Sequence, residues 1–315
     1  GNTTIGCNAA GFNPYQAPIS VTAAGLTHEI TMQPKEAWAL DGPVRFSIFV
    51  PAGVPAIHGA IALFGGPDTR GFTDPEIPMG APDADGATAL RQFADSLKKL
   101  AREYGLAILG TDQPGYASGP SSDADIVTAL QRGAVASGHP DIASVPILTI
   151  GISGGGPEAI GFAHRNASRA IAVVVRVPDK YHNVVMTPAD EAFLNVPLLL
   201  VTGELDDVVD TPFLREMFYR VRGYGGRWAY AEVPGGLHFT APAPVWSLMV
   251  DWVRTAVQLR LSLNSATPLN VIEEGSGWLG DILTRESTPW AAFPGERPAA
   301  SWLPSESVAA RCQAA

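Results

Sequence analysis

Short apolar runs alternate with stretches of helical periodicity over most of this 315-residue chain. The apolar runs are rich in Val, Ile and Leu and stay apolar at every position instead of every second one, as in strands that are buried on both faces. Strands separated by helices are typical of a mostly parallel sheet covered by helices on both sides. The sequence therefore predicts an α/β fold. The predicted strands are residues 44–50, 59–64, 106–111, 145–150, 171–175, 197–202 and 228–233.

Three of the intervening segments carry a clear apolar stripe with a spacing of about 3.6 residues. They lie between residues 90 and 104, 214 and 221, and 246 and 257. Gly105 and Gly223 stand where the first two helices should end, and Pro244 stands where the third should begin. No helical pattern separates the runs that precede residue 59. We therefore expect the sheet to be antiparallel at that edge.

The chain is long enough to bury a large core, and we expect one domain over residues 1–315. Its body should span about residues 40–260, with an N-terminal segment, 1–39, packed on it. From residue 262 to 315 the composition shifts to tryptophan and proline in polar surroundings. We expect an irregular C-terminal extension there, whose aromatic side chains anchor it to the body.

The charge balance excludes several kinds of partner. Lys and Arg total 21 against 31 Asp and Glu, which gives a formal charge of −10. No basic run is available to neutralise phosphates, so nucleic acid and anionic membrane surfaces are not expected as partners. No apolar stretch approaches the ~18 residues of a membrane span. The few histidines and two distant cysteines form no metal-ligand pattern, and no cofactor is expected.

The two cysteines, Cys7 and Cys312, stand at opposite ends of the sequence. They are either two unrelated thiols or a disulfide that ties the termini together, and we expect the disulfide because chain termini are often close in space. A disulfide would indicate an oxidising compartment. The sequence begins at Gly1 without an initiator methionine or a signal-like segment. We expect a processed protein that is secreted or periplasmic.

The segment VPILTIGISGGGPEAIGFAHRN places Ser153 between a predicted strand and a predicted helix. A dinucleotide-binding loop would need glycine where Ser153 stands, and a Walker loop would need lysine where Pro157 stands. What matches is the pattern G-x-S-x-G over residues 151–155. A serine on a sharp, strained turn brings the residues two positions away very close together, and only glycine avoids a clash there. Ser153 is therefore a candidate nucleophile, with a helix N-cap as the alternative.

A serine nucleophile needs a base and an acid that orients the base. His238 follows the last predicted strand on a glycine-containing loop, PGGLH, which is where a base should lie in an open parallel sheet. His182 is the next candidate. The loop after the preceding strand holds four acids, Glu204, Asp206, Asp207 and Asp210. One of them is expected to be the orienting acid, and the others to lie in a solvated turn or at a helix N-terminus.

The chain order serine, acid, histidine resembles that of the α/β-hydrolase superfamily. The resemblance covers about residues 40–260. Its pattern G-x-x-D-x-x-V matches Gly203, Asp206 and Val209, and implies Asp206 as the acid, with Asp207 in reserve. The segment DQPGYASG, residues 112–119, is similar to another loop of the superfamily. Its residues Tyr116 and Ala117 do not match the sequence pattern of that loop, and we assign it no catalytic role.

Acyl transfer also needs donors aimed at the developing oxyanion. The backbone N–H of Gly154, at the mouth of the helix after Ser153, is one candidate. The resemblance implies a second donor after an earlier strand, in IALFGGPD, where Gly65 or Gly66 would supply it.

These residues predict a carboxylic ester hydrolase that works through an acyl-enzyme. The alternatives are a serine peptidase or another acyl transferase with the same triad, and a non-catalytic binding protein on the same fold. Only about twenty residues separate the strands at 171–175 and 197–202, so no large lid is expected. An open cleft suits small or polymer-attached esters, and secreted esterases of polyesters or plant-wall acyl groups are the expected subclass. The oligomeric state is left open.

Overall fold

The computed structural model describes residues 2–7, 12–13, 15–20, 34–65, 68–78, 84–112, 120–179, 187–239, 241–262 and 269–315. Its centre is a sheet of eight strands. These are β3 (Ala37–Leu40), β4 (Phe46–Phe49), β5 (Gly59–Gly65), β6 (Leu106–Thr111), β7 (Ile147–Ile152), β8 (Ala170–Arg176), β9 (Leu198–Gly203) and β10 (Trp228–Val233). Their order across the sheet is β10-β9-β8-β7-β5-β6-β4-β3.

The sheet is parallel from β10 to β6 and antiparallel from β6 to β3. Each strand predicted from the sequence lies in it, and the antiparallel edge is confirmed. The strands from β4 to β10 are buried almost without interruption, as continuous apolar runs require. The α/β fold class predicted from the sequence is therefore confirmed.

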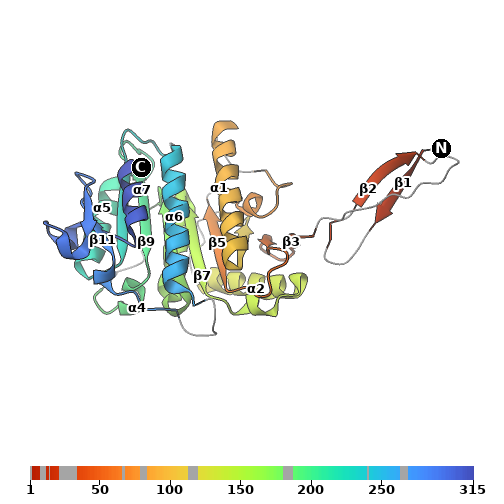
Figure 1. Cartoon of the computed structure of the whole chain (residues 1–315), viewed down its shortest axis with the longest axis horizontal. Helices are drawn as coiled ribbons and strands as arrows, with labels where there is room; N and C mark the ends of the chain where they lie inside the picture. The colour runs from red at the N-terminus through yellow and green to blue at the C-terminus, as the bar shows by residue number, and fades with distance from the viewer. Residues whose placement is uncertain are drawn as a thin grey trace.

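Helices cover both faces of the sheet (Figure 1). The α-helices of the described residues are α1 (Ala84–Tyr104), α2 (Pro120–Ser137), α3 (Gly156–Arg165), α4 (Glu191–Leu194), α5 (Thr211–Gly223), α6 (Ala243–Arg260) and α7 (Glu306–Ala314). Short 3-10 turns are η1 (Arg70–Phe72), η2 (Pro140–Ala143), η3 (Ser153–Gly155), η4 (Ala167–Arg169), η5 (Glu274–Ser276), η6 (Trp290–Ala292) and η7 (Arg297–Ala299). The core side chains of α1, α6 and α7 pack on one face, and those of α2, α3, α4 and α5 pack on the other.

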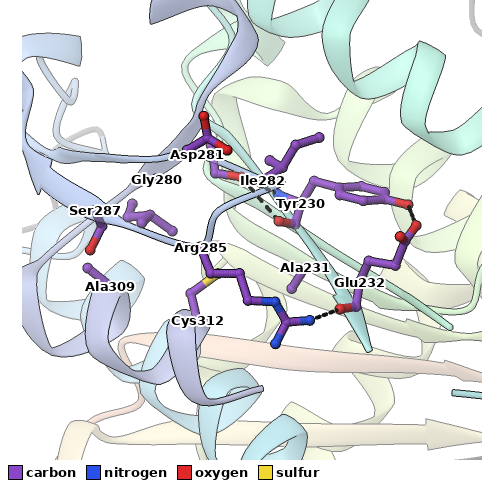
Figure 2. A pocket seen from close by; sticks show the side chains of 12 residues that line it. Tyr230, Ala231, Glu232, Gly280, Asp281, Ile282, Arg285, Ser287, Ala309 and Cys312 are labelled. Carbon is purple, nitrogen blue, oxygen red and sulfur yellow. Dashed lines mark hydrogen bonds between the residues drawn. The ribbon is translucent and has the colours of Figure 1, made fainter. Parts of the chain in front are cut away.

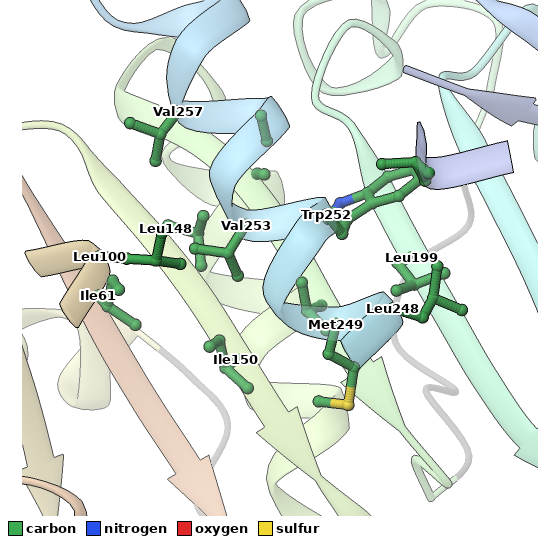
Figure 3. Packing of buried hydrophobic residues seen from close by; sticks show 14 of the residues in the cluster. Ile61, Leu100, Leu148, Ile150, Leu199, Leu248, Met249, Trp252, Val253 and Val257 are labelled. Carbon is green, nitrogen blue, oxygen red and sulfur yellow. The ribbon is translucent and has the colours of Figure 1, made fainter. Parts of the chain in front are cut away.

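Helix α6 shows how the apolar stripes are used. Figure 3 shows its buried side chains, among them Met249, Trp252 and Val253, over apolar residues of the central strands such as Leu148 and Ile150. Burying a large apolar side chain contributes roughly 1.5–3 kcal/mol. The stripe therefore fixes which way α6 faces, and with it the direction of the loop that precedes the helix.

Between β8 and β9 the described residues 177–179 and 187–197 contain one α-helix, the four-residue α4. Seven further residues of this connection, 180–186, lie outside the described residues. A segment of this length has no room for a large helical lid, in agreement with the expectation from the sequence.

The C-terminal extension is more regular than the sequence predicted. It forms a three-stranded antiparallel sheet, β12 (Ser287–Pro289), β11 (Trp278–Gly280) and β13 (Ser301–Leu303), and then α7. Trp302 is fully buried, and its indole N–H donates to the carbonyl of Glu274 at 2.9 Å. Strands of three residues are too short to show a period in the sequence, so this small sheet was missed.

A buried arginine ties the extension to the body. Arg222, at the end of α5, donates to the carbonyls of Ala300 at 2.7 Å and Arg297 at 3.1 Å, and pairs with Glu274 at 3.0 Å. Ser301 adds a second tie, because its hydroxyl accepts from the N–H of Tyr230 in β10 at 2.9 Å. The extension is thus held against the last strand of the sheet.

The predicted disulfide between Cys7 and Cys312 is absent. Cys312 in α7 is a free cysteine, and Figure 1 places α7 far from β1 (Asn2–Cys7), which pairs with β2 (Tyr15–Ser20) in a hairpin set apart from the body. A disulfide requires Cα atoms within about 7 Å. The expectation that the termini meet was wrong, and of the segment 1–39 it is β3 that joins the sheet.

Cys312 instead lines a cavity of about 20 Å³ between the extension and β10 (Figure 2). Arg285 crosses this cavity and donates to the carbonyl of Glu232 at 2.6 Å. Burial raises the pKa of the Cys312 thiol to about 11. The thiol is therefore protonated at neutral pH and belongs to the packing between extension and body.

Candidate active site

The candidate site lies at the point where the order of the parallel strands reverses. The chain leaves β5 for β6 on one side and returns to β7 on the other, so β5 and β7 are neighbours whose connections diverge. In open α/β sheets such a point leaves a crevice beyond the carboxyl ends of the strands. Gly65 and Ile152, the last residues of these two strands, lie side by side, and Ser153 follows directly.

Ser153 occupies a strained turn between β7 and α3. Its φ is 53°, in the left-handed region that side chains other than glycine rarely adopt. A Cβ at Gly151 would lie 2.6 Å from the carbonyl oxygen of Gly155, and one at Gly155 would collide with the main chain of Phe64. The two glycines of the pattern are therefore required by close main-chain approaches, as the sequence predicted.

Three predicted side chains meet at this turn. The Ser153 hydroxyl is 2.9 Å from Nε2 of His238, and Nδ1 of His238 is 2.9 Å from Oδ2 of Asp206. The imidazole is almost fully buried, and the Asp206 side chain has no exposed surface. The structure thus joins serine, imidazole and carboxylate in one chain of hydrogen bonds, although His238 is 85 residues from Ser153.

The Asp206 carboxylate is held by hydrogen bonds from its own loop. Oδ1 of Asp206 accepts from the N–H groups of Val208 at 2.9 Å and Val209 at 3.2 Å. Its neighbour Asp207 is exposed, and Asp210 caps α5 by accepting from Phe213 N–H at 3.0 Å. The helix-capping role expected for the other acids is thus seen at Asp210, and Asp207 has no place at the imidazole.

Other predicted residues stand around these three. Gly154 is buried in η3 at the start of α3, and the main chain of Gly65 runs against Gly155. Gly66 and His182 lie outside the described residues, as do residues 113–119 of the DQPGYASG segment. Of the remaining described histidines, His164 pairs with Asp190 at 3.2 Å.

Sequence analysis missed one residue close to this chain of hydrogen bonds. Arg176, the last residue of β8, is 5% exposed, and its guanidinium donates to the main-chain carbonyl of His238 at 3.0 Å. The only indication in the sequence was that a charged residue ends the apolar run AIAVVVR. Its partner is 62 residues away, however, so the sequence could not identify it.

Exposed apolar side chains border the site on two loops. They are Leu205 (58% exposed), Val208 (61%), Leu237 (53%) and Phe239 (69%), which we call the apolar rim. The N–H of Leu205 donates to the carbonyl of Gly236 at 2.9 Å, so the acid loop and the histidine loop are joined. The rim residues thus stand within two positions of Asp206 or His238 in the sequence, and their exposed side chains are suited to contact with apolar groups.

The described part of the chain holds no group of three or more His, Cys, Asp and Glu side chains that could bind a metal ion. Within the same residues, none of the helices combines the length and apolarity needed to cross a bilayer.

Comparison with known proteins finds similarity to this chain in three-dimensional structure and not in sequence. Neither a protein-family model nor a curated protein matches the sequence. Solved structures that match include esterase 2 of Thermogutta terrifontis phosphonylated by sarin, at 15% identity and a TM-score of 0.45 over 71% of this chain and 95% of that one. A cold-adapted esterase from an Arctic intertidal metagenomic library matches at 14% identity and 0.45 over 70% and 92%. A serine hydrolase without a lid from Xanthomonas campestris matches at 15% and 0.43 over 71% and 95%. The reaction of this chain has to be inferred from its own side chains.

Proposed function

We propose that this protein is a serine hydrolase of the α/β-hydrolase type that cleaves carboxylic esters. The observation that carries the proposal is the continuous chain from the Ser153 hydroxyl through His238 to the buried Asp206 carboxylate. A hydroxyl is a weak nucleophile at neutral pH, and an imidazole held by a carboxylate is the group that activates it. The strained φ of Ser153 supports the same role, because strain of this kind is typical of functional positions.

In the proposed reaction, Ser153 Oγ attacks the ester carbonyl carbon while His238 Nε2 takes the hydroxyl proton. Nδ1 of His238 keeps its own proton and donates a hydrogen bond to Asp206. The carbonyl oxygen becomes an oxyanion that accepts from Gly154 N–H and from a second N–H, at Gly65 or Gly66. The carbon–oxygen bond to the alcohol then breaks, and the alcohol leaves with the proton from His238.

Water completes the cycle. It attacks the acyl carbon while His238 takes one of its protons, the bond to Ser153 Oγ breaks, and the serine regains a proton from the imidazole. The acid leaves and the enzyme is restored.

The apolar rim favours ester substrates that present an apolar surface, including polymer-attached esters. Each of its four side chains is more than half exposed. Docking of an apolar surface would remove them from water, which is favourable. The adjoining exposed acids Glu204 and Asp207 favour uncharged surfaces over anionic ones. Polyesters and acylated plant-wall polymers are the proposed substrates of this kind.

Hydrolysis of p-nitrophenyl esters of two to sixteen carbons tests the proposal. We expect turnover by the wild type and a loss of at least about 10³-fold in Ser153→Ala. Ser144→Ala is the control, because Ser144 is exposed and precedes β7 at the opposite end of the strand. No turnover by folded wild type, with cleavage of peptide substrates instead, would favour a peptidase, and equal activity in wild type and Ser153→Ala would overturn the proposal.

A further inference from the structure

Arg176 stands between the strands that deliver the nucleophile and the acid. In the sheet its Cα is paired with Ile152 of β7 on one side and Val201 of β9 on the other. Ile152 precedes Ser153, and β9 leads into the loop of Asp206. The side chain is directed to the face covered by α6, since its guanidinium lies 5.5 Å from the ring centre of Trp246.

The guanidinium is held on two sides. It donates to the carbonyl of His238 at 3.0 Å, and Trp246 is itself packed against Phe93 of α1 at 5.0 Å between ring centres. A planar cation between an aromatic face and a carbonyl has little freedom to move. The main chain of His238 is thus tied to β8, the strand next to the one that carries Ser153.

The charge of Arg176 acts on the same carboxylate that faces the imidazole. Burial lowers the pKa of Arg176 to about 10, and the negative charge of Asp206 opposes this effect. The guanidinium therefore carries its charge at neutral pH. A buried cation near Asp206 stabilises the carboxylate that faces the imidazole.

We propose that Arg176 is a positioning residue that holds the His238 loop against Ser153. The proposal rests on the hydrolase function proposed above.

Asp179 lies three residues after Arg176 in the sequence. Its N–H donates to the carbonyl of Ser153 at 3.2 Å. An Asp179→Asn variant keeps this main-chain hydrogen bond and serves as the control for a charge change in the segment that follows β8.

The test is the rate at which phenylmethanesulfonyl fluoride labels Ser153 at pH 7, with mass spectrometry to follow the labelling. In this step the Ser153 oxygen bonds to sulfur, the sulfur–fluorine bond breaks, and the hydroxyl proton passes to His238. The readout needs an active serine but no ester turnover, so a wrong substrate assignment would leave it intact. A wild type that is folded but not labelled would instead refute the proposed function.

Arg176→Met removes the charge and keeps an apolar chain on Trp246, and Arg176→Lys keeps the charge without the planar fork. In Arg176→Met we expect labelling to slow about tenfold at pH 7, as for the loss of one hydrogen bond from a charged donor. Asp179→Asn should stay within about twofold of the wild type. Arg176→Lys should label at a rate between those of Arg176→Met and the wild type, because its ammonium can donate to the carbonyl of His238 but lacks the planar stacking on Trp246.

Labelling of Arg176→Met at the wild-type rate would overturn the proposal. A loss in Arg176→Lys as large as that in Arg176→Met would also overturn it, because donation to the carbonyl of His238 would then contribute nothing. If Arg176→Met does not fold, Arg176→Lys decides, since a rate equal to that of the wild type contradicts the proposal.

Discussion

Replacing Asp206 by Asn tests the site most directly, because the structure determines how the amide must turn. Oδ1 accepts from the N–H groups of Val208 and Val209, and Nδ1 of His238 lies closer to Oδ2, at 2.9 Å, than to Oδ1, at 3.2 Å. An amide offers one oxygen and one NH₂. If the oxygen keeps the two loop N–H groups, the NH₂ faces Nδ1, which must then accept. The imidazole proton moves to Nε2, where it points at Ser153 and blocks proton abstraction.

The opposite orientation of the amide is costly. It would place NH₂ against the N–H groups of Val208 and Val209 in a buried loop, and leaving buried donors unpaired costs about 1–3 kcal/mol each. The orientation that blocks catalysis is therefore favoured. In serine hydrolases an inverted imidazole of this kind lowers kcat by about 10⁴-fold. That factor corresponds to about 5.5 kcal/mol of lost transition-state stabilisation.

The assay is kcat/KM for p-nitrophenyl acetate at pH 7.5, with circular dichroism to verify folding. Asp207→Asn is the matched control, because Asp207 is exposed and adjacent in sequence, and we expect it to stay within about twofold of the wild type. Folded Asp206→Asn that retains a tenth of the wild-type activity would refute the tautomer reasoning. A comparable loss in Asp207→Asn would refute the choice of acid.

Three further predictions concern packing. Gly155→Ala should lower the free energy of unfolding by at least about 2 kcal/mol and activity by at least tenfold, because its Cβ would meet the main chain of β5. Gly223→Ala is the control, because a Cβ at this position at the end of α5 would meet no other atom within 4 Å. It should change the free energy of unfolding by less than about 1 kcal/mol in urea titration. Equal losses of stability in the two variants would contradict the strained turn described around Ser153. Trp302→Ala should cost about 3–5 kcal/mol in urea unfolding, and a loss below 1 kcal/mol would mean that the extension is not anchored there. In a Cys7→Ser variant at pH 8, iodoacetamide should alkylate native Cys312 about 100-fold more slowly than in the unfolded chain, because burial raises the thiol pKa to about 11, and equal rates would contradict its burial.

The sheet was largely predictable from the sequence, because strands buried on both faces leave continuous apolar runs. Helix α2 was missed, since its buried face contains Ala129 and Ala134 besides Ile126 and Leu130, and alanine does not stand out as a stripe. The four-residue β3 and the three-residue strands of the extension were missed because they are too short to show a period.

Within the candidate site, the glycines around Ser153 were predictable because the turn requires them locally. The contact of Ser153, His238 and Asp206 was expected from the sequence motifs and the chain order, since Ser153 follows β7, Asp206 follows β9 and His238 follows β10. Arg176 could not be identified in this way, because its partners are brought together by the packing of α6 on the sheet. The disulfide prediction failed for a related reason, as no local pattern tells how far apart two termini lie.

The bonds between the extension and β10 bear on how the protein associates with itself. An outermost strand displays main-chain N–H and carbonyl groups that a strand of another molecule can pair with. Here Ser301 occupies both the N–H and the carbonyl of Tyr230, and Arg285 occupies the carbonyl of Glu232. The extension thus protects the sheet from adding foreign strands. A chain cut at residue 262 would expose this side of β10 and would be expected to aggregate through it, even with Ser153, His238 and Asp206 untouched.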